Sequence, residues 1–369
     1  MRRRWRSRAG LRFAAGLGAL LAGPAPAAPL DALLTALPER IAPAGYAELG
    51  VDRLNRALDF STSNDIDPDL APPASGSYRG FHASGALRVS ESLWLSGGLW
   101  HRDISSAADT FRYLGWQVAG QYRFNEAAGA VPAIALRLGA WGNRSKATET
   151  TTPVRVQGAV LDTVKVSKPS DQQLQADLLA TWQPSPRLDI SAVLGLGRTR
   201  LSFDALSATT RRNGCNYQLA FNGNDIFGTL IPPCTASGGV IQQFYDSSGD
   251  YGVDVDNELA WQGRFWQVGV NAGWRDGPWS LLGGYLYHEV RRENVDAILA
   301  ERGDPVFRHN HIVALEAGYE VQPRWTLFLR SQISSNLFFN DIPVTYNSST
   351  SASFGSRYSM FTLGLRAGF

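Results

Sequence analysis

The residue types that most often carry out catalysis are present in this sequence but are not arranged in a recognisable catalytic motif. A lipase-type site needs a histidine beside a serine, and one type of protease site needs paired acids near a histidine. No histidine lies in a motif of the first kind, and Asp254 and Asp256 are the one pair that suggests the second. We interpret these acids as solvated residues on an extended strand and expect no catalytic residue. The five histidines are His82, His101, His288, His309 and His311.

His309 and His311 lie on one face of an expected strand, so their two imidazoles could bind one metal ion. A metal site needs at least a third protein ligand, which the sequence does not show. No glycine-rich phosphate-binding loop appears either. We therefore expect neither a metal site nor a cofactor.

The N-terminus is typical of a secretory signal peptide. Residues 1–13 carry six arginines and no acid, an apolar stretch covers 14–22, and Ala25-Pro26-Ala27 offers a small-x-small cleavage site. We expect cleavage near Ala27 rather than a retained membrane anchor, because the apolar stretch is shorter than the roughly 20 residues of a spanning helix. In an exported protein we expect Cys215 and Cys234 to form a disulfide, since the periplasm is oxidising.

Removal of the signal peptide changes the net charge of the chain. The sequence has 35 basic and 33 acidic residues, and without the six arginines 29 basic residues remain, a net charge of −4. This charge gives no reason to expect nucleic acid as a partner. The chain is 44% hydrophobic, yet after residue 27 it has no run of 18 apolar residues. A membrane protein without spanning helices must be a closed barrel, because closure satisfies the backbone groups within lipid.

After residue 44 the hydrophobic pattern has a period of two. In the last segment Phe361, Leu363 and Leu365 share one face, while Thr362 and Arg366 share the other. Such segments of about ten residues are typical of transmembrane strands. We predict an all-β fold, a single antiparallel up-and-down barrel of about twelve strands, with 10 to 14 as the range. The expected strands are 45–56, 78–90, 93–102, 111–124, 131–143, 172–183, 187–203, 258–275, 279–291, 307–321, 325–337 and 356–369.

Short and long connections alternate along the chain, as periplasmic turns and extracellular loops should. A soluble secreted β protein, the alternative, has no reason to place its long loops at one end. Leucines at helical spacing in 28–44 predict a periplasmic lead-in, either unstructured or a short helix. The expected long extracellular loops are 57–77, 144–171, 204–250, 292–306 and 338–355.

The alternation predicts two further sets of residues in the barrel of residues 45–369. Aromatic rings near the short turns resemble an interfacial girdle; they are Trp94, Phe124, Trp182, Trp274, Trp279 and Trp325. Charges on the polar faces should line the lumen, either as pairs that brace a filled barrel or as the walls of a passage. These charges are Arg88, Arg123, Arg137, Asp177, Glu316, Glu320, Arg330 and Arg366.

The last strand resembles the C-terminal signal by which the assembly machinery of the outer membrane recognises barrel proteins. The similarity consists of Phe361, Leu363, Leu365, Ala367 and the terminal Phe369 at alternate positions. The stretch 113–142 also resembles a hairpin of the small outer-membrane barrels of Gram-negative bacteria. The resemblance implies an outer-membrane location, with outer-membrane lipid, lipopolysaccharide and the assembly machinery as partners. The resemblance is to a broad class of proteins rather than to one family, so it implies no functional residue.

Polar lumen residues without a catalytic motif predict a non-enzymatic barrel. It would be either a narrow porin-like channel for small solutes or a structural barrel with surface loops. Two alternatives remain open: a barrel enzyme acting on lipid or peptide, and an accessory barrel for export of a surface polymer. The solute, the oligomeric state and the openness of the bore do not follow from the sequence.

Overall fold

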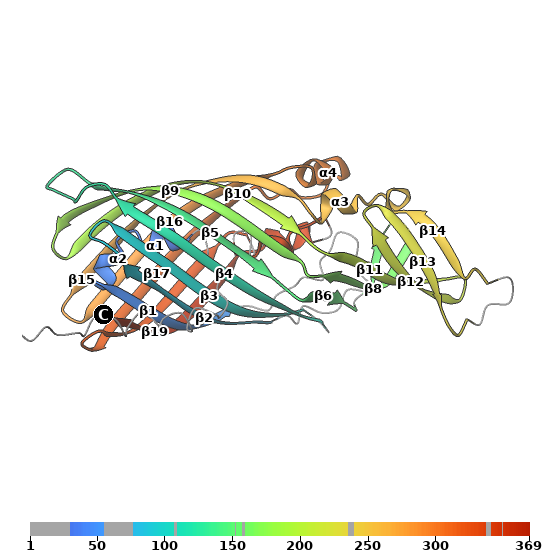
Figure 1. The fold of residues 1–369 in the computed structure, drawn as a ribbon, viewed down its shortest axis with the longest axis horizontal. Coiled ribbons are helices and arrows are strands. Elements are labelled where there is room, and N and C mark those ends of the chain that lie inside the picture. Colours follow the sequence, from blue (N-terminus) through green and yellow to red (C-terminus); the bar gives the residue numbers. More distant parts are fainter. Residues whose placement is uncertain are drawn as a thin grey trace, which may run out of the picture.

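Twelve antiparallel strands close into a barrel in the computed structural model of the chain (Figure 1). The structure describes residues 30–54, 77–106, 109–151, 153–156, 159–234, 240–336, 341–348 and 350–369. The expected signal peptide, 1–27, lies outside the described residues, and so does nearly all of loop 57–77. The barrel strands are β1 Gly45–Leu54, β2 Ser77–Arg88, β3 Leu93–Ser106, β4 Asp109–Arg123, β5 Ala133–Arg144, β9 Ser170–Ser185, β10 Leu188–Ser202, β15 Gln262–Asp276, β16 Trp279–Arg292, β17 His309–Gln322, β18 Trp325–Ser334 and β19 Tyr358–Gly368.

Each barrel strand pairs with its neighbours in chain order, and the first strand closes the barrel on the last. Glu48 of β1 lies opposite Arg366 of β19 in this closing ladder. The predicted up-and-down topology and the number of strands are therefore confirmed. Several strand boundaries differ from the prediction by two to four residues; for example, β15 begins at Gln262 rather than at residue 258 and β3 ends at Ser106 rather than at residue 102. Asp254 and Asp256 do not lie on a strand extension, because Asp254 caps the helix α3, Val255–Glu258, by accepting a hydrogen bond from the Asn257 amide.

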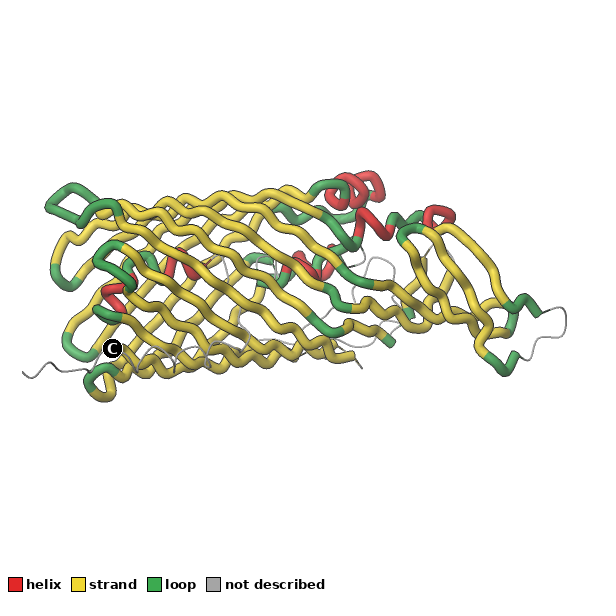
Figure 2. The backbone as a smooth tube through the Cα atoms, viewed as in Figure 1, coloured by secondary structure: helices red, strands yellow, loops and turns green. Residues whose placement is uncertain are grey.

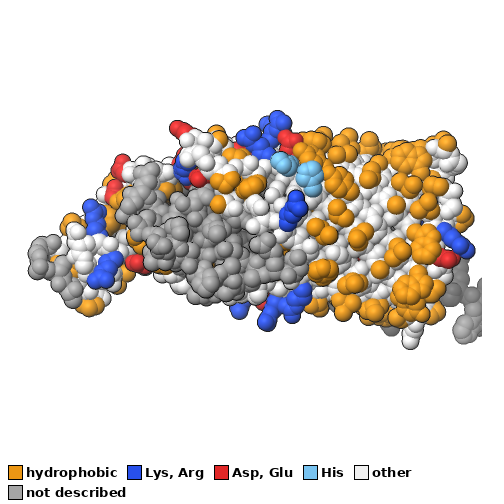
Figure 3. Space-filling model, turned by 180° about the vertical axis from the view of Figure 1, so that it is seen from behind, with side chains coloured by type: hydrophobic (Ala, Val, Ile, Leu, Met, Phe, Trp, Pro, Cys, Tyr) orange, Lys and Arg blue, Asp and Glu red, His pale blue; other side chains and the backbone are white. Residues whose placement is uncertain are grey.

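The outer surface of the barrel is apolar around its middle (Figure 3). Side chains at alternate strand positions point outward, for example Leu174 at 66% exposure and Leu196 at 64%. The positions between them, such as Gln173 and Asp177, are buried at 1% exposure each. Since a soluble sheet protein would bury the apolar face, this inside-out arrangement is that of a membrane barrel. Among the described residues, no helix is both long and apolar enough to cross a membrane.

Two of the expected loops form a second sheet beyond one end of the barrel (Figure 2). The segments 144–171 and 204–250 were predicted as long extracellular loops. They instead prolong the β9–β10 hairpin outward, so that β8 follows the line of β9 and β11 that of β10. The strands of this outer sheet are β6 Ala147–Thr150, β7 Val154–Val156, β8 Ala159–Ser167, β11 Ala205–Arg212, β12 Cys215–Asn222, β13 Asp225–Ile231 and β14 Gln243–Ser247.

Short helices lie at both ends of the barrel (Figure 1). The two that precede β1 lie inside the barrel near the end with the short turns, not outside it as a periplasmic lead-in. The others lie at the end that carries the outer sheet. They are α1 Leu30–Leu34 and α2 Pro38–Ile41 at the first end, and η1 Ser248–Tyr251, α3, α4 Val295–Arg302, η2 Pro343–Thr345 and η3 Ser351–Gly355 at the second.

Candidate functional site: a barrel closed from both ends

Helix α1 fits into a socket in the inner wall of the barrel. Leu33 has no exposed surface and packs against buried Leu286, Ile312 and Ala314. The floor of the socket is glycine: a Cβ at Gly284 would lie 2.8 Å from a methyl carbon of Leu33. A larger residue at this position would therefore exclude the leucine side chain.

Polar side chains of the wall hold the backbone of the same segment. Gln121 donates a hydrogen bond of 3.0 Å to the Ala36 carbonyl, and Arg137 donates one of 2.9 Å to the Thr35 hydroxyl. Asn271 donates to the carbonyl of Leu33. At the mouth of the barrel, Arg123 pairs with Glu39. Because β4, β5 and β15 all contribute, the segment is fixed from several sides.

A second segment, 341–348, enters the barrel from the opposite end. It belongs to the loop 338–355, which was predicted to be extracellular; its described part turns inward instead. The Asp341 carbonyl accepts hydrogen bonds from Arg102 of β3 at 2.9 Å and from Asn143 of β5 at 3.1 Å. The Asp341 carboxylate accepts one from Tyr358 of β19 at 2.5 Å. Asp341 thus joins strands on opposite sides of the barrel.

The rest of this inward segment is anchored in the same way. The amide of Val344 donates to the Asp171 carboxylate of β9 at 3.0 Å. The indole of Trp261 donates to the Tyr346 carbonyl at 2.8 Å, and the Arg292 guanidinium lies 3.6 Å from the centre of the Tyr346 ring. Tyr346 is 1% exposed. We call residues 341–348 the outer plug and residues 32–41 the inner plug.

An ion-pair network lines the wall between the two plugs. Glu48 accepts hydrogen bonds from Arg366 at 2.7 Å and from Arg330 at 3.2 Å. Glu316 lies 2.6 Å from Arg330 and 3.0 Å from Arg366. The four residues come from consecutive strands of the barrel, with Glu48 on β1 and Glu316 on β17 on either side of the two arginines, so each arginine contacts both acids. Such pairing is needed because an isolated charge inside the barrel would be costly.

The predicted lumen charges fall into two groups. Arg137, Asp177, Glu316, Arg330 and Arg366 lie inside the barrel. Arg88, Arg123 and Glu320 lie instead at the mouth with the short turns, where Arg88 and Arg123 bind turn carbonyls.

Sequence reasoning missed three buried groups of this network. They are Glu48, Asp52 and His82. The two ring nitrogens of His82 lie 3.3 Å from the Glu48 carboxylate and 3.0 Å from the Asp52 carboxylate. The signal that could have found them is the alternation of Glu48, Gly50 and Asp52 with the outward Leu49 and Val51.

The aromatic residues near the short turns are mostly exposed on the barrel exterior. Trp94 is the exception: it is 4% exposed and packs against Tyr46 and Ala86, so it faces the lumen. The sequence could not show that Trp94 faces inward, because the adjacent Leu95 is also apolar and alternation therefore does not reveal which of the two faces the lipid. The exposed rings are Phe124, Trp274, Trp279 and Trp325, and Trp182 is half-buried. On the last strand Phe361, Leu363, Leu365 and Phe369 are exposed and Ala367 is half-buried.

The remaining histidines lie away from one another or face outward. His288 is buried and stacks on Phe265, with ring centroids 5.0 Å apart. His309 and His311 are exposed on the exterior, and their ring centroids are 5.8 Å apart. His101 lies 3.2 Å from Asp103. In the described part of the chain, no three His, Cys, Asp or Glu side chains are grouped so that they could hold a metal ion.

A cavity of about 830 Å³ lies between the outer plug and the outer sheet. Its floor includes Val344, Asn347 and Ser348, and its walls are mainly apolar side chains of the sheet. Leu206 and Leu219 are among them, at 7% and 5% exposure. A second cavity, of about 110 Å³, lies between the inner plug and the wall. The outer plug thus separates a large outer chamber from a nearly filled lumen.

Charged groups sit at the edges of the outer chamber. Arg302 is paired with Glu258 at 2.9 Å, and the Tyr251 hydroxyl donates to Asp246. The hydrogen bond to Asp246 raises the pKa of the Tyr251 phenol, and burial adds to the effect. The same hydrogen bond joins η1 to β14 at the edge of the chamber.

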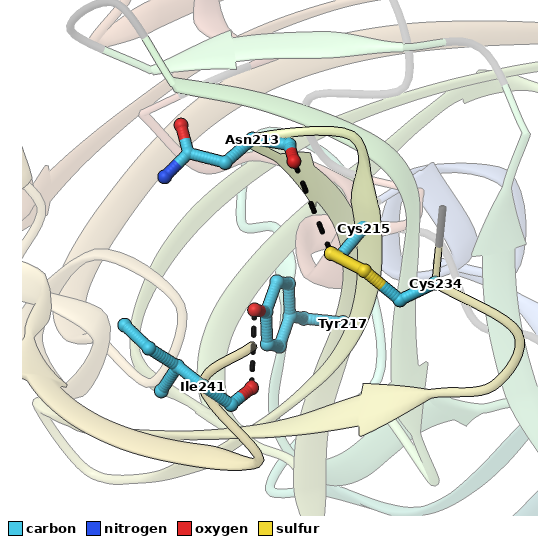
Figure 4. The surroundings of a disulfide bond; sticks show 5 residues. All are labelled: Asn213, Cys215, Tyr217, Cys234 and Ile241. Atoms are coloured by element: carbon cyan, nitrogen blue, oxygen red, sulfur yellow. Dashed lines mark hydrogen bonds between the residues drawn. A yellow bond between two sulfur atoms is a disulfide. The ribbon is translucent and has the colours of Figure 1, made fainter. Parts of the chain in front are cut away.

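The outer sheet is held together by the predicted disulfide (Figure 4). Cys215, the first residue of β12, is bonded to Cys234, which follows β13, and their Cα atoms are 4.8 Å apart. Beside the bond, the Tyr217 hydroxyl donates to the Ile241 carbonyl at 3.1 Å. Together these contacts connect β12 to both ends of the segment that leads from β13 to β14.

The closed antiparallel topology, the apolar outer surface and the polar, filled interior identify the class of the protein. The chain is a twelve-stranded membrane-type β-barrel. No family model and no curated protein sequence matches it.

Solved structures similar to this chain include barrels of several kinds. The translocator domain of the autotransporter NalP from Neisseria meningitidis is 11% identical, with 88% of this chain and 89% of that chain covered and a TM-score of 0.47. The KdgM porin is 7% identical, with 88% and 99% covered and a TM-score of 0.37. The CymD monoaromatic hydrocarbon channel is 10% identical, with 88% of each chain covered and a TM-score of 0.38.

Proposed function

We propose that the protein is a gated channel of the outer membrane, whose bore is shut at rest by the inner and outer plugs. The observation that carries this proposal is that two separate segments enter the lumen from opposite ends. Each is held by directional hydrogen bonds from several strands, as a movable but specific closure requires. A purely structural barrel could fill its lumen with wall side chains alone, as barrels of about 8 strands do.

The outer chamber supports the same proposal. Its volume is in the range of sites that bind small molecules, roughly 300 to 1,000 Å³, and its walls are mainly apolar with a few polar groups. Its floor is the outer plug, so a molecule bound there contacts the gate directly. We therefore propose that the solute is a small, mainly apolar molecule that enters from the outside.

Planar-bilayer recordings test the channel function. Wild-type protein should be almost silent, whereas Gly284→Leu should show frequent openings, because the new side chain occupies the socket of Leu33. The matched control is Gly283→Leu on the same strand, where an added Cβ meets only Leu315 at 3.4 Å on the outer side. Equal and low conductance for all three folded proteins would refute the gated channel.

A role in surface recognition is the second candidate. The observation that favours it is the ordered outer sheet, with exposed Phe227 and Tyr245 in an edge-on contact of 5.3 Å between ring centroids. This role would require binding of a partner by cells that carry the protein, and its loss after Phe227→Ala, without any change in conductance.

A further inference from the structure

A row of arginines crosses three neighbouring strands on the outside of the barrel. In the strand register Arg198 of β10 lies opposite Arg264 of β15, and Arg264 lies opposite Arg291 of β16. All three side chains are exposed. Side chains directly opposite on antiparallel strands have Cβ atoms only about 4.5 to 5.5 Å apart, and like charges there repel. The row is therefore unfavourable unless an anion neutralises it.

The protein itself supplies little of that negative charge. Glu289 lies 3.0 Å from Arg291 and is the one acid in contact with the row among the described residues. Arg198 and Arg264 form no ion pair with a described residue. Two lysines that could also contact anionic lipid differ from these arginines because each is neutralised within the protein. Lys168 pairs with Asp204 at 2.6 Å and Lys165 with Glu149 at 3.1 Å.

The row stands at the edge of the apolar band. One step toward the middle of the barrel, the row of outward side chains contains Leu196 opposite Trp266, at 64% and 36% exposure. A tryptophan beside the end of an apolar band marks the level of the lipid headgroups. Basic side chains gather at this edge of the band in the space-filling view (Figure 3). The arginines thus lie at the height of the headgroups, on the side of the outer sheet.

We infer that Arg198, Arg264 and Arg291 form a binding site for the phosphates of a phosphorylated glycolipid in the outer leaflet. Guanidinium groups bind phosphate oxygens through paired hydrogen bonds, and a row of them matches a headgroup with more than one phosphate. Acyl chains of the same lipid would lie along Leu196 and Trp266 below. The inference depends on the proposed placement in the outer membrane but not on conduction through the barrel.

Native mass spectrometry in a zwitterionic detergent tests the site, with diphosphorylated lipid A as the probe. The Arg198→Gln, Arg264→Gln double variant should bind it at least about tenfold more weakly, because it loses the charged hydrogen bonds of two guanidinium groups to the phosphates. The matched control, Arg211→Gln with Arg212→Gln on the outer sheet, loses the same charge and should bind like wild type. Equal binding by both double variants would overturn the inference.

Two further probes separate the lipid from other anions. Fully dephosphorylated lipid A should bind poorly to wild type, and millimolar inorganic phosphate should not displace the intact lipid. Displacement by phosphate would show a general anion site and would overturn the lipid assignment.

Thermal unfolding adds a readout that a merely structural role would not give. Without lipid A, the Arg198→Gln, Arg264→Gln variant should unfold at the same temperature as wild type or higher, since repulsion is relieved. Addition of lipid A should raise the unfolding temperature of wild type by more than it raises that of the variant. A variant that is less stable than wild type in the absence of lipid would contradict the site. Bilayers that stay silent for Gly284→Leu as well as for wild type, alongside specific lipid binding, would reject the channel and leave this site intact.

Discussion

The barrel and the outer sheet use the same alternating pattern but turn their apolar side chains in opposite directions. Leu194 and Leu196 of β10 point outward at 51% and 64% exposure, whereas Leu206 and Ala208 of β11 point inward at 7% and 2%. The reversal takes place within a few residues, where β10 ends at Ser202 and β11 begins at Ala205. The surroundings therefore decide which face is buried: lipid accepts the apolar face of β10, while water drives that of β11 onto the chamber.

The strongest test of this comparison is a buried charge inside the barrel. Glu48 is 4% exposed and holds both Arg330 and Arg366. Glu48→Gln should lower the free energy of unfolding by about 3 to 5 kcal/mol, because it removes one of the two carboxylates of the network and leaves Arg330 and Arg366 to share Glu316 alone. Urea unfolding in lipid vesicles measures the change. A loss below about 1 kcal/mol, the range of exposed ion pairs, would show that water fills the lumen.

The second largest difference is expected when a charge is introduced on the outward face of each region. Leu194→Arg places a cation against lipid near the middle of the barrel and should cost about 2 to 4 kcal/mol. Ser207→Arg, on the face of β11 that looks away from the chamber, should change stability by less than about 0.5 kcal/mol. Both values come from the same unfolding assay. Equal costs would mean that the two exteriors meet the same solvent.

The disulfide should matter for the outer sheet and not for the barrel. Replacing Cys215 and Cys234 with serine removes a crosslink over 19 residues, which stabilises by about 3 kcal/mol on chain-entropy grounds. Limited proteolysis should then cut within 205–247, while the barrel keeps its resistance to heat in detergent. Unfolding of the barrel in this variant would contradict the independence of the two regions.

The smallest effect is expected at an exposed ion pair of the outer sheet. Lys168 and Asp204 are 2.6 Å apart, but their side chains are 72% and 57% exposed. Lys168→Ala should leave stability unchanged within error, because water screens the pair. A loss comparable to that of Glu48→Gln would remove the distinction between buried and exposed pairs.

The barrel could be predicted from the sequence because lipid imposes a strict period of two on each spanning strand. Glu316 and Arg330 were both predicted from that period to face the lumen, and they lie opposite each other in the register. The outer sheet was not predicted, because its strands are shorter than the barrel strands and lie within the long connections that were expected to be extracellular loops.

The two plugs could not be predicted either. Leu33 looks like any leucine at helical spacing, and nothing near Asp341 in the sequence indicates that its partners are Arg102 and Asn143. These contacts join residues more than 190 positions apart, so only the closed barrel brings them together.

A reversible lock on the inner plug tests the closed barrel most directly. Leu33→Cys combined with Gly284→Cys, in a background where Cys215 and Cys234 are serine, should form a disulfide across the socket. The account predicts silent bilayers for the oxidised protein and repeated openings after reduction, since the plug then lacks its leucine anchor. The same steady current before and after reduction would contradict it, because the bore would then be open with the inner plug in place.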